Sequence, residues 1–132
     1  MALNPHLAAA SSNAACAAVT ARADGGHLAV YDGAQPADGD TPPAGVLLAT
    51  LALASPSFGA PVAGLATANP ITSAQAVAAS SATWFRVYAA DGTTPVFDGS
   101  IGTAGSNVTM STTTIVVGAW VSVTALTFAV PE

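Results

Sequence analysis

Turn-forming residues punctuate the chain from His27 onward and leave only short runs between them. These runs often alternate apolar and polar side chains, and turn signals recur about every ten residues. Such a pattern predicts a mainly β fold, an antiparallel β-sandwich or jelly roll of about eight short strands with one N-terminal α-helix. Because no strand–helix–strand alternation is present, we do not expect a parallel sheet. The expected strands are residues 27–32, 46–53, 62–68, 84–89, 95–101, 107–110, 113–117 and 120–130, with residues 71–79 left ambiguous.

An alanine-rich helix is expected at the N-terminus. Asn4-Pro5 suits the N-cap and the first helical position, and neither glycine nor a further proline follows before Arg22. Asp24-Gly25-Gly26 should end the helix. We therefore divide the chain into residues 1–26, a helix with its cap, and residues 27–132, an antiparallel β domain. One face of this helix, which would pack on the β domain or on a partner chain, carries Leu3, Leu7, Ala10, Ala14, Ala17 and Ala21.

The clearest expected strand is WFRVYA, at residues 84–89, and it begins a β-hairpin. Alternation places Trp84, Arg86 and Tyr88 on one of its faces. We expect this face to cover a core edge or a second sheet. If the face instead points outward, the three side chains form a candidate contact patch.

The last expected strand changes phase along its length. Val121 and Val123 occupy one phase, whereas Leu126 and Phe128 occupy the other. A strand buried on one face cannot switch phase without a bulge or a crossing between sheets. We therefore predict a bulge or bend near Thr124-Ala125.

A long loop rich in glycine, proline and aspartate runs from Asp32 to Gly45. Loops of this length in a small domain are uncommon and are often functional. Asp32, Asp38 and Asp40 make it a candidate interaction loop. Asp38-Gly39-Asp40 alone lacks the roughly six to eight oxygen ligands that calcium needs, so we expect no bound metal.

Charged residues make up 7% of the chain, lysine is absent, and the only arginines are Arg22 and Arg86. With a net charge of −5, the chain lacks the cationic surface that nucleic acid or an anionic membrane would need. A neutral surface rich in alanine and hydroxyl groups suits a protein docked in an assembly. A GC-rich genome would enrich alanine, glycine, proline and threonine without any structural purpose, and this alternative stays open.

The residues that usually carry catalysis are sparse and scattered. His6 and His27 lack the spacing of a helical metal pair, and Cys16 is the only cysteine. Aspartate mostly precedes glycine, as in ordinary turns. Neither a nucleophile elbow nor a phosphate-binding glycine loop is present. We therefore expect no enzyme, no catalytic residue, no metal and no cofactor.

The chain shows no sign of a targeting segment or a membrane span. No basic residue precedes the apolar-leaning residues 7–21, and Ser11-Ser12-Asn13 interrupts them, unlike a signal peptide. No apolar run reaches the roughly 18 residues of a transmembrane helix.

Several segments together resemble short proteins encoded among the structural genes of tailed bacteriophages. They are LAVYDG, GVLLATLALASPSFG, GLATANPITS and ATWFRVYAADGTTPVFDGSIGTAGS, followed by a closing strand rich in threonine and valine. The resemblance implies a non-catalytic virion component assembled in the host cytoplasm. Its favoured role would be a capsid decoration, or cement, protein on the outer surface of the head. Its partners would be the major capsid protein, other virion proteins and further copies of itself.

Two other functions stay open at this point. The protein could belong to the tail or tail tip instead of the head. It could also be a carbohydrate-binding adhesive module that uses exposed aromatic side chains.

Overall fold

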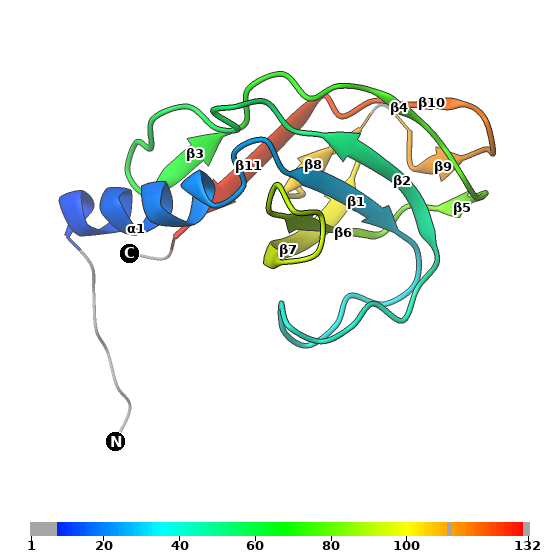
Figure 1. Cartoon of the computed structure of the whole chain (residues 1–132), viewed down its shortest axis with the longest axis horizontal. Helices are drawn as coiled ribbons and strands as arrows, with labels where there is room; N and C mark the ends of the chain where they lie inside the picture. Colours follow the sequence, from blue (N-terminus) through cyan, green and yellow to red (C-terminus); the bar gives the residue numbers. More distant parts are fainter. Residues whose placement is uncertain (1–7, 111, 131–132) are drawn as a thin grey trace.

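The computed structural model describes residues 8–110 and 112–130 of the chain. Within those residues it contains one helix, α1 (Ala9–Ala21), and eleven short strands (Figure 1). The strands are β1 (His27–Tyr31), β2 (Leu47–Ala52), β3 (Leu65–Thr67), β4 (Ala74–Gln75), β5 (Ser80–Ser81), β6 (Trp84–Tyr88), β7 (Pro95–Gly102), β8 (Val108–Thr109), β9 (Thr114–Ile115), β10 (Trp120–Val121) and β11 (Ala125–Ala129). The fold is mainly β, as the sequence predicts.

Seven strands form one sheet in the order β2-β1-β6-β7-β8-β11-β3, and two smaller sheets pair β10 with β4 and β5 with β9. The arrangement is sandwich-like, while the jelly roll stays a prediction. The expectation of a purely antiparallel sheet is wrong at one place, since β7 and β8 pair in parallel, with Ile101 opposite Val108. This pair spans only two residues, so the short turn between the strands suffices to carry the chain back.

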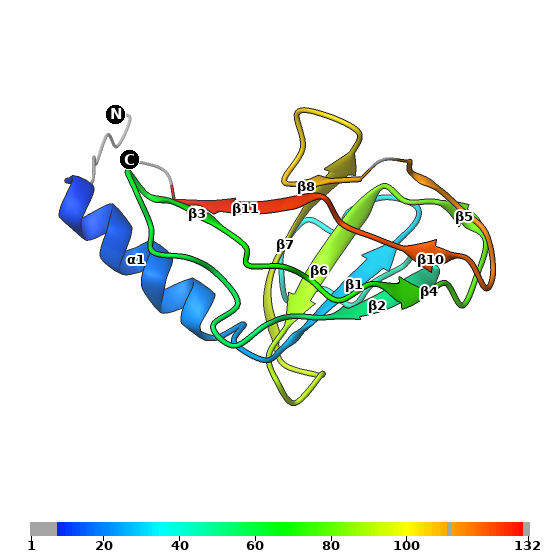
Figure 2. The ribbon, with the colours of Figure 1, turned by 90° about the horizontal axis from the view of Figure 1, so that it is seen from above.

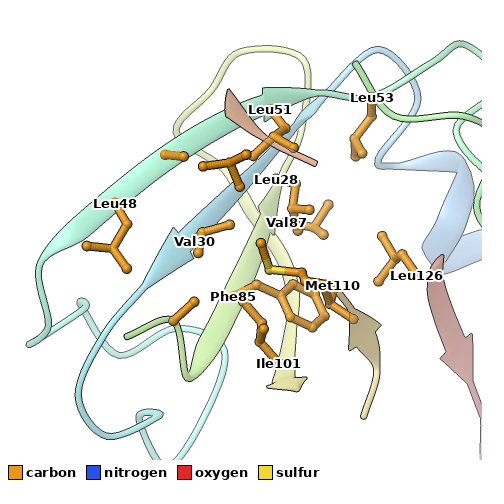
Figure 3. Packing of buried hydrophobic residues seen from close by; sticks show 14 of the residues in the cluster. Leu28, Val30, Leu48, Leu51, Leu53, Phe85, Val87, Ile101, Met110 and Leu126 are labelled. Carbon is orange, nitrogen blue, oxygen red and sulfur yellow. The ribbon is translucent and has the colours of Figure 1, made fainter. Parts of the chain in front are cut away.

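The main core lies on one face of the β2-β1-β6 part of the sheet (Figure 3). Leu28 and Val30 on β1 and Phe85 and Val87 on β6 are fully buried there. Side chains alternate along a strand, so the intervening residues of β1 and β6 point to the opposite face. That outer face carries the aromatic residues described below.

The helix packs on its own chain, against β3 and β11 at one end of the molecule (Figure 2). It ends as predicted, with Gly25 at a φ of 66°. Its expected Asn4-Pro5 start lies outside the described residues, as do His6 and the first two members of its predicted packing face, Leu3 and Leu7.

The predicted packing face of the helix is wrong. Ala10, Ala14, Ala17 and Ala21 are exposed, and the buried face instead carries Ser12, Cys16 and Thr20. Ser12 and Thr20 can be buried because their hydroxyls donate hydrogen bonds to helix carbonyls, to Ala9 at 3.1 Å and to Cys16 at 3.0 Å. In an alanine-rich helix, apolar periodicity carries too little contrast to identify the buried face.

The predicted bend near Thr124-Ala125 is confirmed. β10 ends at Val121, β11 begins at Ala125, and the two strands belong to different sheets. Thr124 marks the crossing, because its backbone N–H and its hydroxyl both donate to the carbonyl of Thr109. Val121 and Leu126 are therefore both buried despite their opposite phases.

Candidate functional site

The face that carries Trp84, Arg86 and Tyr88 points away from the main core but is covered. Trp84 is 1% and Arg86 2% exposed, and only Tyr88 is half-buried. The candidate contact patch is thus not an exposed surface. The loop of residues 32–45 lies over it, so a loop covers this face where a core edge or a second sheet was expected.

Arg86 fastens this loop to the sheet. Its guanidinium donates to the carbonyls of Thr41 at 2.6 Å and Asp38 at 3.2 Å, and pairs with the Asp98 carboxylate at 3.1 Å. The guanidinium carbon also lies 5.4 Å from the ring centre of Trp84, within cation–π range. A buried arginine needs such partners, because an unpaired charge is costly away from water.

The base of the loop is closed by a second set of contacts. The Asp32 carboxylate accepts the backbone N–H of Val46 at 2.6 Å, and this bond lowers the pKa of Asp32. The Asp32 carbonyl accepts the indole N–H of Trp84 at 2.9 Å, and the Gly33 carbonyl accepts the Thr83 hydroxyl at 2.6 Å. Both ends of the loop are therefore held to the strands.

The Asp38 carboxylate accepts hydrogen bonds from its own loop and is therefore already occupied. One carboxylate oxygen accepts the hydroxyl of Thr41 and the backbone N–H groups of Asp40 and Thr41. These bonds, the Thr41 hydroxyl first, lower the pKa of Asp38. Asp38 and Asp40 are exposed, so the candidate interaction loop is accessible but has a defined shape.

A groove of about 540 Å³ lies on the same outer face, beside the covered arginine. Ala29 on β1 forms part of its lining, and we call this hollow the outer-face groove. Larger side chains surround Ala29: His27, Tyr31, Leu47, Thr50, Tyr88 and Thr93. None of these lining residues is Asp, Glu, Lys or Arg.

Aromatic stacking makes one wall of the outer-face groove rigid. The rings of Tyr31 and Trp84 stack with centres 4.5 Å apart, and the hydroxyls of Tyr31 and Tyr88 lie 3.2 Å apart. Burial, followed by the Tyr88 hydrogen bond, raises the pKa of Tyr31 well above its usual range. Tyr31 is therefore a neutral hydrogen-bonding group throughout the physiological pH range.

A second surface lies at the end of the molecule away from α1 (Figures 1 and 2), where β4 pairs with β10. Trp120 is 69% exposed there, and the neighbouring Val77, Val116 and Val117 are also exposed. Backbone hydrogen bonds join Ala76 to Ala119 and to Gly118, so both segments belong to one surface. We call residues 74–77 and 114–121 the docking end.

The sequence analysis did not identify the docking end, although the distribution of charged residues along the chain points to it. Residues 41–85 and 99–131 contain no Asp, Glu, Lys or Arg, and both segments of the docking end come from these stretches. A hollow of about 190 Å³ beside Trp120 is lined partly by Met110, Ile115 and Val121.

Cys16 and Asp24 serve the packing of the fold, whereas His27 keeps one ring nitrogen without a hydrogen bond. Cys16 is buried, and Asp24 accepts the hydroxyl and backbone N–H of Ser57. His27 lies at the rim of the outer-face groove, where its buried Nδ1 makes no hydrogen bond with any described residue. Within residues 8–110 and 112–130, His, Cys, Asp and Glu do not gather in groups of three or more that could hold a metal ion. In the same part of the chain, no helix combines the length and apolar character of a membrane span.

Comparisons with protein-family models, with curated proteins and with solved structures found no match to this chain.

Proposed function

We propose that this protein is a non-catalytic structural component of a tailed bacteriophage, a decoration protein that docks on the outer surface of the head. Its partners in this proposal are the major capsid protein and further copies of itself. The sequence resemblance to phage structural proteins supplies the context. The observation that carries the proposal is the docking end, where Trp120 is exposed among valines and no charged residue is present.

The chemistry of the docking end favours a protein partner. Tryptophan is enriched among the residues that dominate binding energy at protein interfaces, and charged residues are depleted at interface cores. An uncharged surface of valine, alanine, threonine and tryptophan loses little hydration energy when a partner covers it. A large exposed apolar surface would make a free monomer self-associate. In a virion protein this surface is covered once the protein has docked, so it can be tolerated.

Separated heads and tails from purified particles of the encoding phage test the proposal by quantitative mass spectrometry. We expect the protein in many copies with the heads and absent from the tails. Recovery only with tails would overturn the head-decoration role and favour a tail or tail-tip component. Absence from both fractions would overturn the virion proposal as a whole.

A further inference from the structure

We propose that the outer-face groove binds a neutral saccharide. This proposal concerns a different surface from the docking end and goes beyond a purely structural role. None of the groove-lining residues belongs to β4, β9, β10 or the turn that carries the exposed valines. A docked protein could therefore hold a sugar without releasing its partner.

The hollow arises from the residue pattern on three neighbouring strands. Ala29 lies on β1, directly opposite Thr50 on β2 and Arg86 on β6. His27 and Tyr31 flank it two residues away on the same face, because side chains alternate along a strand. A methyl group among larger side chains leaves a depression, and its volume of about 540 Å³ falls within the range of small-molecule sites.

The lining matches the two kinds of surface that a sugar presents. Tyr88 is half-buried and can stack on the apolar face of a pyranose ring. Thr50 and Thr93 are exposed at the groove, where their hydroxyls can donate to or accept from sugar hydroxyls. Since no Asp, Glu, Lys or Arg lines the groove, it offers no permanently charged counter-ion to an anionic or cationic ligand. These features favour a neutral polyhydroxylated ligand.

The groove is held in shape before any ligand arrives. Tyr31 is stacked on Trp84 and is hydrogen-bonded to Tyr88. At the other side, the Asp91 carboxylate accepts the backbone N–H groups of Thr93 and Thr94 at 2.9 Å each, which fixes the turn that carries Thr93. A site formed in advance avoids the ordering cost that weakens ligand binding to flexible surfaces.

The test is an NMR titration of the full chain with maltose, cellobiose, lactose and N,N′-diacetylchitobiose, and with sialyllactose as a charged comparison. We expect saturable shifts from at least one neutral disaccharide, confined to backbone amides around Ala29, Thr50, Tyr88 and Thr93. Tyr88→Ala should weaken that binding about tenfold or more, whereas Tyr88→Phe, which keeps the ring, should retain most of it. Thr103→Val, an exposed threonine between β7 and β8 that belongs to neither surface, is the control and should leave the affinity unchanged.

Three results would overturn the proposal. They are an absence of binding by every neutral disaccharide, shifts that map away from the groove, and binding that Tyr88→Ala leaves intact. Binding of sialyllactose alone is one form of the first result, because the ligand class would then be anionic. The folded state of each variant is checked by its own amide spectrum, and the wild-type titration decides the central question even if a variant does not fold. Binding at the groove by a protein absent from virions would contradict the proposed function and leave this inference standing.

Discussion

Arg86 and Asp98 face each other across the β6–β7 ladder, with Nη2 of the guanidinium 3.1 Å from Oδ2 of the carboxylate. Their side chains are 2% and 12% exposed, so the pair is held largely away from water. The same arginine also binds two carbonyls of the loop above it. The buried Arg86 side chain therefore connects the β6–β7 pairing to the position of the loop of residues 32–45.

Removing the charge of Asp98 should destabilise the fold strongly. Asp98→Asn leaves the Arg86 guanidinium buried without its counter-ion, a change that typically costs about 3–5 kcal/mol. Urea unfolding followed by fluorescence measures the effect. Asp40→Asn, on the exposed loop, is the matched control and should change stability by less than about 0.5 kcal/mol. Equal stability of the two variants would show that the ion pair contributes nothing.

Replacing Arg86 should release the loop of residues 32–45. Arg86→Met removes the donors to the Asp38 and Thr41 carbonyls, whereas Asp98→Asn keeps them. Hydrogen–deuterium exchange should therefore accelerate in this loop much more in Arg86→Met than in Asp98→Asn. Unchanged exchange in Arg86→Met would mean that the contacts at the base of the loop suffice to order it.

Cys16 should report on the docking of the helix. The thiol is fully buried, and burial raises its pKa, so both access and the thiolate fraction are reduced. We expect no reaction with a thiol-specific reagent such as DTNB under native conditions and complete reaction in denaturant. Rapid native labelling would contradict the packing of α1 on β3 and β11.

The β6–β7 turn should weaken in acid. Hydrogen bonds from the Thr94 hydroxyl and from the backbone N–H groups of Thr94 and Thr93 lower the pKa of Asp91 from 3.8 to about 2. Because the folded-state pKa is the lower one, the stabilisation is present above about pH 4 and is lost as the pH falls through about 2. Asp91→Asn should reduce the pH dependence of unfolding in this window. A slope identical to that of the wild type would contradict this role of Asp91.

Local alternation predicted much of the sheet but not what covers it. The WFRVYA pattern correctly placed Trp84, Arg86 and Tyr88 on one face. Whether that face is open depends on where a loop about fifty residues earlier in the chain folds back, and periodicity carries no information on such long-range contacts. The sequence therefore predicts a contact patch only if this face is exposed, and the burial of Trp84 and Arg86 excludes it as a surface.

The bend before β11 was predictable from the sequence, because a strand buried on one face must keep its apolar side chains in a single alternating phase and this segment does not. The docking end was harder to recognise, since β4, β9 and β10 are each two residues long and show no periodicity. The outer-face groove was not predictable either. It depends on a single small residue, Ala29, lying among side chains from three strands and from the β6–β7 turn.

Docking through Trp120 is tested most directly by the binding of purified protein to phage heads assembled without it. The comparison is between wild type, Trp120→Ser and Val62→Ser. Val62 is 74% exposed but lies next to β3, away from the docking end, and is the matched control. We predict that wild type and Val62→Ser saturate the heads, and that Trp120→Ser loses about 2 kcal/mol or more of binding free energy. Equal binding by Trp120→Ser and wild type, or no binding by wild type, would contradict binding to the head through the docking end.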